Sequence, residues 1–200
     1  MPAKSKSKPS AHNRSTVRII GGRLRGRRIP VPPDGVRPTP DRVRETVFNW
    51  LTPWLTGTRC LDLFAGTGAL GLEALSRGAA EAVFVDQNRR AADQLREILR
   101  DLSCQHARVV VADAQRLAYA AMGSFDIVFL DPPFGTTDLQ VLCKLLESSG
   151  ALAEGAHIYM EMNRRQTLPE LPATWTIIRE QTAGQVRFAL AERNPAVIKE

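Results

Sequence analysis

Residues 59–71, RCLDLFAGTGALG, join a short apolar strand to a glycine-rich turn and the beginning of a helix. The turn contains Gly66-Thr67-Gly68 and, with Gly71, formally satisfies the GxGxxG pattern of nucleotide-binding folds. Glycines let a ligand approach the backbone at the head of a helix, where the first amide groups favour anions. The stretch therefore predicts a ligand at the end of the strand, without separating a nicotinamide cofactor from S-adenosylmethionine.

Apolar strands alternate with helical segments from residue 59 onward. Because the first four strands are nearly continuous apolar runs, we expect them to be parallel and covered on both faces. The pattern predicts strands at 59–64, 82–86, 108–113, 125–131, 157–162, 174–180 and 186–192, and helices at 69–78, 89–102, around 114–121 and at 138–149. This alternation predicts an α/β, doubly wound, mostly parallel sheet with ligands at the carboxyl ends of its strands. The last two strands are close in sequence, which predicts one antiparallel edge.

Acidic residues end the first three of these strands. Asp62 lies four residues before the first glycine, where dinucleotide-binding folds usually carry an apolar residue, and its carboxylate suits a cationic amino group such as that of S-adenosylmethionine. Asp86 can accept hydrogen bonds from both ribose hydroxyls, and Asp113 can reach the adenine amino group. The alternative for Asp113 is a helix N-cap. The candidate cofactor-binding residues are Asp62, Phe64, Gly66, Gly68, Asp86 and Asp113.

A second candidate site, Asp131-Pro132-Pro133-Phe134, follows the fourth apolar strand. The two prolines stiffen the loop, so the Asp131 carboxylate and nearby carbonyl groups form a rigid set of acceptors. An amino group on an aromatic ring is a poor nucleophile, and such acceptors can grip its N–H bonds and aim its lone pair. Asp131 can also take the proton that leaves, and Phe134 can stack on an extruded base. The structural alternative is a plain turn that ends a strand.

The N-terminal quarter is strongly basic: residues 1–59 hold 13 Lys and Arg against 3 Asp and Glu, whereas the whole chain has a net charge of +6. We expect residues 1–15 to be a disordered basic tail, residues 16–52 an RNA-facing hairpin and helix extension, and residues 53–200 the catalytic domain. Two short strands about Gly21-Gly22 form the hairpin, and Asp41 caps a helix that ends near Leu51. The candidate RNA-binding residues are Arg18, Arg23, Arg25, Arg27, Arg28, Arg37 and Arg42. Thr39 and Arg44 could lead from this surface to the pocket, and a solvated basic face is the alternative.

Composition excludes several classes of protein. With 44% hydrophobic and 24% charged residues, the chain matches an ordinary globular domain. No apolar run is long enough for a membrane span, and residues 1–10 lack the apolar stretch of a secretory signal. Cys60, Cys104 and Cys143 are widely spaced in apolar surroundings, so we expect buried free thiols in a cytoplasmic protein and no metal site.

At this point the chain resembles the RsmD family, bacterial 16S rRNA guanine-N2 methyltransferases. The resemblance spans about residues 17–190 and rests on RIIGGRLRGRRIPVP with RPTPDRVRETVFNWL, on LDLFAGTGALGLEALSRGA and on FLDPPF. It implies a Rossmann-like class I methyltransferase fold, a seven-stranded sheet with one antiparallel strand and an N-terminal β-hairpin. It also implies S-adenosylmethionine as cofactor and 16S rRNA, in an assembling or assembled small subunit, as partner of a monomer without membrane contact. Many relatives have a second acidic residue where this chain has Asn88.

Three other functions remain open from the residues alone. An adenine-N6 methyltransferase also uses a D-P-P-aromatic loop, but it normally needs a target-recognition region that no part of this chain obviously supplies. A nicotinamide-dependent oxidoreductase is disfavoured by Asp62 and by the loop at Asp131. A non-catalytic ribosome-assembly factor would have no need of the complete candidate site.

Overall fold

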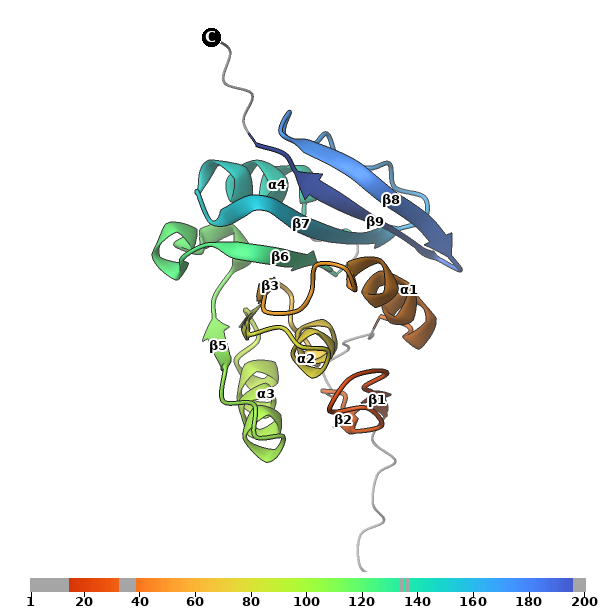
Figure 1. Ribbon diagram of the computed structural model, residues 1–200, viewed down its shortest axis with the longest axis vertical. Coiled ribbons are helices and arrows are strands. Elements are labelled where there is room, and N and C mark those ends of the chain that lie inside the picture. Colours follow the sequence, from red (N-terminus) through yellow and green to blue (C-terminus); the bar gives the residue numbers. More distant parts are fainter. Residues whose placement is uncertain (1–14, 33–38, 134, 136, 196–200) are drawn as a thin grey trace, which may run out of the picture.

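The computed structural model describes residues 15–32, 39–133, 135 and 137–195. Seven strands form its central sheet in the order β5-β4-β3-β6-β7-β9-β8 (Figure 1). The strands are β3 Arg59–Asp62, β4 Glu81–Asp86, β5 Ala107–Val111, β6 Phe125–Leu130, β7 Leu152–Asn163, β8 Trp175–Ala183 and β9 Val186–Arg193. The pairs from β5 to β7 are parallel, and β9 is antiparallel to both of its neighbours. The predicted doubly wound, mostly parallel sheet with one antiparallel strand is confirmed.

The last two strands form the expected antiparallel edge, in which β9 lies inside the sheet and β8 is the edge strand. A hairpin at Gly184 and Gln185 joins β8 to β9, and β9 pairs with β7. Strand β9 is mostly buried, whereas most residues of β8 are exposed or half-buried. The more apolar strand therefore takes the inner position, and β8 closes the sheet.

Helices cover both faces of the sheet and bury two apolar clusters. The helices are α1 Asp41–Leu51, α2 Ala69–Ser76, α3 Arg89–Asp101 and α4 Leu139–Ser148, with 3₁₀ turns η1 Ala114–Arg116 and η2 Tyr119–Met122. Helices α1, α2 and α3 pack on one face, and α4 with the 3₁₀ turns packs on the other. The single short helix predicted around 114–121 is wrong. Leu117 is extended there, and the chain bends so that the buried Tyr119 hydroxyl donates to the Ala114 carbonyl at 2.6 Å.

Helix α1 begins at the predicted residue but without the predicted cap. Pro40 holds the N-cap position with φ −57° and ψ 145°, and no side chain caps the helix. The Asp41 carboxylate instead accepts a hydrogen bond from Arg44 Nη2 at 2.6 Å, so it serves an ion pair within the first turn.

The predicted hairpin is confirmed, with a longer connection than expected. Strands β1 Thr16–Arg18 and β2 Arg28–Pro30 pair antiparallel, and residues 19–27 connect them. Gly21 and Gly22 therefore lie within a loop. This loop lies against α2, and an added Cβ at Gly22 would stand only 1.8 Å from the Ser76 carbonyl oxygen.

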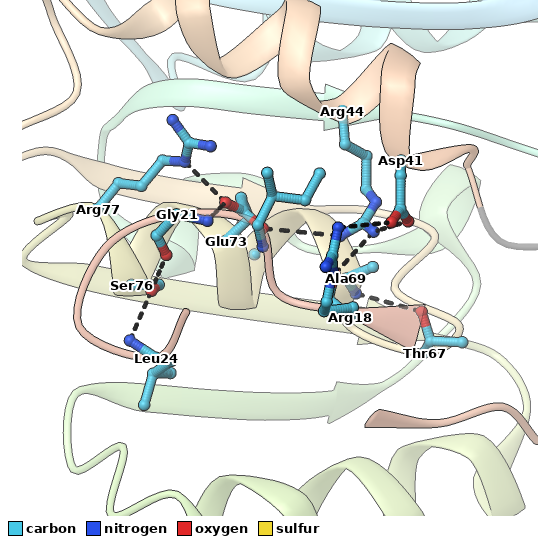
Figure 2. Close-up of polar contacts among 12 residues, drawn as sticks. Arg18, Gly21, Leu24, Asp41, Arg44, Thr67, Ala69, Glu73, Ser76 and Arg77 are labelled. Carbon is cyan, nitrogen blue, oxygen red and sulfur yellow. Dashed lines mark hydrogen bonds and ion pairs between the residues drawn. The ribbon is translucent and has the colours of Figure 1, made fainter. Parts of the chain in front are cut away.

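Two side chains of α2 bind the backbone of this loop (Figure 2). The fully buried Glu73 carboxylate accepts from the amides of Ile20 at 2.8 Å and Gly21 at 2.7 Å. One turn later, the Ser76 hydroxyl accepts from the Leu24 amide at 2.9 Å and donates to the Gly21 carbonyl. The extension is thus fixed to the helix that carries the glycine turn, and Ile19, Leu24 and Ile29 join the same apolar cluster.

Arg44 adds α1 to this junction. It is fully buried, its Nη2 donates to the Arg18 carbonyl at 2.8 Å, and its Nη1 lies 3.6 Å from Glu73 Oε2. Arg77 Nε donates to Glu73 Oε1 at 2.7 Å from the other side. The suggestion that Arg44 leads from an RNA surface to the pocket is wrong, because its guanidinium is engaged in this internal ion pair.

The cysteines are free and buried, as predicted. Burial raises the pKa of the Cys60 and Cys143 thiols to about 12, so both stay protonated at neutral pH. None of the helices among the described residues has the length and hydropathy that a membrane span requires.

We expect Glu73→Ala to lower the free energy of unfolding by about 3–5 kcal/mol, because it removes the buried carboxylate that pairs with Arg44 and leaves the amides of Ile20 and Gly21 without their acceptor. Urea denaturation measures the loss. Glu45→Ala, which removes an exposed glutamate of α1, is the matched control and should stay within about 0.5 kcal/mol of the original. Equal stability of the two variants would contradict a central role for Glu73.

Candidate active site

The predicted carboxylates lie along one edge of the sheet. Asp62 and Asp86 are the last residues of β3 and β4, while Asp113 and Asp131 closely follow β5 and β6. These four strands are adjacent and parallel, so their carboxyl ends meet at the same edge. The structure therefore brings together acidic residues that are up to 69 positions apart in the chain.

The glycine turn between β3 and α2 has the conformation that its sequence predicts. Gly66 has φ 51° and Gly68 has φ 75°, both in the left-handed region that favours glycine, and α2 begins directly after Gly68. Gly71 allows close packing between α2 and β4. A Cβ at this position would lie 2.3 Å from the Phe84 ring, so only glycine fits there. Phe64, in the same turn, is half-buried against the second apolar cluster.

Asp62 is almost fully buried beneath the glycine turn, with 2% of its surface exposed. Its Oδ2 accepts from the Gly71 amide at 3.0 Å. Burial, with the charges of Asp131 and Asp86, raises the pKa of this carboxyl to about 7, although the hydrogen bond from Gly71 lowers it. A cation placed beside a buried carboxyl with a pKa near 7 would stabilise its ionised form.

Asp86 braces the turn and remains accessible. Its Oδ2 accepts from the Gly66 amide at 2.8 Å and its Oδ1 accepts from the Asn88 amide at 2.8 Å. Each carboxylate oxygen has a second lone pair, so both can still accept from hydroxyl groups. Asn88 caps α3 by accepting from the amides of Arg90 and Ala91, which gives this position a structural role in place of a second acid.

Asp113 is a helix N-cap, the alternative role that the sequence left open for it. Its Oδ1 accepts from the Gln115 amide at 2.9 Å, so it is the N-cap of η1, and its side chain is exposed. Contact with an adenine amino group stays a prediction.

The loop after β6 holds Asp131 in contact with the N-terminal extension. Asp131 Oδ2 accepts a hydrogen bond from Thr39 Oγ1 at 2.8 Å. Removal from water raises the pKa of Asp131 to about 6, and the Thr39 hydroxyl opposes that rise. Pro132 is buried and Pro133 exposed. Phe134, predicted to stack on a base, lies outside the described residues.

Glu161 is an acidic residue of this region that the sequence did not single out. It lies on β7 beside β6, it is 4% exposed, and its Oε2 accepts from the Tyr159 hydroxyl at 2.8 Å. Burial, Glu161 and Asp131 together raise the pKa of Tyr159 well above its usual range. A glutamate within the apolar run HIYMEM is the signal that could have found it.

The predicted RNA-binding arginines of the described residues are all exposed. Arg18 lies 3.8 Å from Asp41, and Arg23 Nη2 lies 3.6 Å from the Cys104 sulfur. Arg28 Nη1 donates to the Thr16 hydroxyl at 3.3 Å. Arg25 and Arg27 are in the loop that packs on α2, and Arg42 is on α1. Arg37 lies outside the described residues.

Comparison with known proteins identifies relatives along nearly the whole chain. The family described as Conserved hypothetical protein 95 matches residues 17–192. Ribosomal RNA small subunit methyltransferase D of Escherichia coli strain K12 is 47% identical, over 93% of this chain and 94% of its own length. The protein of the same name from Haemophilus influenzae is 41% identical, over 87% and 92%. The solved structure of yhhF from Escherichia coli is 47% identical, covers 90% of this chain and 99% of its own, and has a TM-score of 0.82.

The strand order, with one reversed strand near the end of a parallel sheet, is that of the class I S-adenosylmethionine-dependent methyltransferases. The chain belongs to the RsmD family, which the Conserved hypothetical protein 95 description covers. The resemblance drawn from the sequence is thereby confirmed.

We expect the affinity for S-adenosylmethionine to weaken as the pH falls from 7.5 to 5.5. If Asp62 pairs with the cationic amino group of the ligand, as the sequence predicts, then protonation of this carboxyl below its pKa of about 7 removes that partner. Titration calorimetry should show the Kd rising toward about tenfold per pH unit. Asp62→Asn should bind more weakly at pH 7.5 and lose this pH dependence, whereas Asp101→Asn, at an exposed position of α3, should keep it. A pH-independent Kd of the unmodified protein would refute this role of Asp62.

Proposed function

We propose that this protein transfers a methyl group from S-adenosylmethionine to the exocyclic N2 amine of a guanine in 16S rRNA. The observation that carries the proposal is the Asp131 carboxylate, which stands at the same sheet edge as Asp62 and is held by Thr39. The names of the Escherichia coli and Haemophilus influenzae relatives support small-subunit rRNA as substrate. Guanine as the base, an assembling or assembled subunit as the particle, and action as a cytoplasmic monomer follow the RsmD resemblance.

The residues at the strand ends suit the methyl donor. Asp62 is a buried carboxyl for the ammonium group of the methionine moiety, and Asp86 has free lone pairs for the ribose hydroxyls. The left-handed Gly66 and Gly68 let the ligand pass close to the backbone. S-adenosylmethionine, when bound, supplies a methyl group activated by an adjacent sulfonium.

Asp131 would prepare the nucleophile. Its carboxylate accepts an N–H of the guanine amine, which draws the nitrogen lone pair out of conjugation and directs it at the methyl carbon. The new N–C bond forms as the C–S bond breaks, and the bond's electron pair stays on sulfur. The nitrogen then loses one proton, and Asp131 or a neighbouring water molecule takes it. All of this requires ionised Asp131, so activity should decline below a pH of about 6.

The exposed arginines of the extension would bind RNA. Arg25 and Arg27 belong to a loop whose backbone is fixed on α2, so their guanidinium groups project from a rigid support. Contacts with phosphates would orient the RNA without reading its sequence. The target base would be extruded from its stack to reach the strand-end edge.

Asp131→Asn should lower kcat by about 10²–10⁴-fold, because the amide presents an N–H donor or a weaker acceptor to the target amine. The Kd for S-adenosylmethionine should hardly change. Single-turnover transfer of a labelled methyl group to small-subunit particles, with mass mapping of the modified nucleotide, measures both the rate and the site. Asp101→Asn is the isosteric control on an exposed surface. A near-normal single-turnover rate in Asp131→Asn would exclude the amine-gripping role.

Replacing Arg25 and Arg27 together by Ala should weaken particle binding across RNA sequences. The slope of log affinity against log salt should fall by about 0.7–0.9 for each phosphate that the variant no longer neutralises. Binding isotherms at several salt concentrations give the slope, and Arg100 with Arg165, exposed outside the extension, are the control pair. An unchanged slope with full activity would favour a merely solvated basic face.

A further inference from the structure

Thr39 lies directly before Pro40 and α1, and its side chain reaches the loop that follows β6. The hydrogen bond from Thr39 Oγ1 to Asp131 Oδ2, 2.8 Å long, joins residues 92 positions apart in the chain. Only 6% of the Thr39 surface is exposed. A hydroxyl that donates to a carboxylate makes one of the stronger hydrogen bonds in proteins, because its acceptor is charged.

The backbone that follows Thr39 is firmly held. The Pro40 carbonyl accepts from the amides of Val43 at 3.0 Å and Arg44 at 3.1 Å. The Arg44 side chain in turn binds the Arg18 carbonyl and pairs with Glu73 of α2. The position of the Thr39 hydroxyl is therefore set by the packing of the hairpin loop and α1 against α2. It does not depend on the loop of Asp131 itself.

The other titratable groups around Asp131 are acidic or neutral, and its charge raises the pKa of both Asp62 and Tyr159. Asp62 faces it from β3, and Tyr159 faces it from β7, with Glu161 bonded to the Tyr159 hydroxyl. Removal from water favours the protonated form of Asp131, and the Thr39 hydrogen bond favours the ionised form. The bond from Thr39 to Oδ2 orients the carboxylate, and its oxygens have further lone pairs with which to accept from the target amine.

We propose that Thr39 is a positioning residue for methyl transfer: it orients the Asp131 carboxylate toward the target amine, and the N-terminal extension thereby completes the active site. The inference rests on the proposed function of Asp131. It gives the extension a second task besides RNA binding, since removing one hydroxyl there should slow the chemical step.

Three variants test the assignment. Thr39→Val keeps the shape and removes the hydroxyl, Thr39→Ser keeps the hydroxyl, and Thr46→Val removes a hydroxyl from α1 that bonds within its own helix. Thr39→Val should lower the single-turnover rate at saturating substrate by about 10- to 100-fold with little change in the Kd for either substrate. Thr39→Ser should restore the rate to within about threefold, and Thr46→Val should match the original. Circular dichroism and urea denaturation show whether each variant is folded.

The pH dependence separates positioning from general damage to the fold. Loss of the Thr39 hydrogen bond raises the pKa of Asp131, so the acidic limb of the rate profile should move to higher pH in Thr39→Val and return in Thr39→Ser. Carbon-13 NMR of the Asp131 carboxyl, assigned with Asp131→Asn, follows the same titration without any substrate. A merely structural Thr39 would change the stability and leave both titrations where they were.

The outcomes also separate this inference from the proposed function. A Thr39→Val protein with the original rate, pH profile and carboxyl titration overturns the inference while methylation by the unmodified protein stands. If the unmodified protein methylates no rRNA, the proposed function fails, and the NMR titration still decides whether Thr39 sets the state of Asp131. If the Asp131 carboxyl of Thr39→Val then titrates at the same pH as in the unmodified protein, the inference about Thr39 is rejected as well.

Discussion

The buried carboxylate of Glu73 joins its own helix to two segments that lie earlier in the chain, the hairpin loop and α1. It accepts two backbone amides of the extension, it pairs with Arg44 of α1, and it accepts from Arg77 at the end of its own helix. A carboxylate without exposed surface is tolerable only when every such partner is in place. The positions of the extension, of α1 and of the glycine turn at the other end of α2 are therefore set together.

The two ends of α2 consequently have different tasks. The first residue follows Gly68 and faces the ligand edge, whereas Glu73 and Ser76 face the extension. Through α1, the same junction reaches Thr39 and Asp131 at the neighbouring strand end. Since the charges of Asp86 and Asp131 add to burial in raising the pKa of Asp62, negative charge gathered at this edge is electrostatically unfavourable, and a cationic ligand would relieve it.

Local pattern was enough to predict the sheet and most of its ligand edge. Alternating apolar runs and helices predicted the strands, and because parallel strands share their carboxyl ends, Asp62, Asp86 and Asp131 could be placed at one edge in advance. Contacts between distant segments could not be predicted in this way: Arg44 reads as one more surface arginine, and nothing local reveals that Glu73 lies opposite. Glu161 lies within an apolar strand, where a glutamate is easily taken for a residue without a role. The chain leaves the helical conformation at Leu117 and Tyr119 bonds to Ala114, and hydrophobic periodicity does not predict that contact. The identity of the base and of the particle depends on RNA contacts, which no single residue type encodes.

Helix α2 recognises the extension largely through its main chain, by the amides of Ile20, Gly21 and Leu24. Main-chain groups are the same whatever side chain follows, provided that Gly22 keeps its close approach to Ser76. Exposed positions such as Arg25 and Arg27 are therefore free to drift in evolution, or to be exchanged by design, without loosening the attachment. A related protein could in this way present quite different side chains on the exposed side of this loop, while the attachment of the loop to α2 stayed the same.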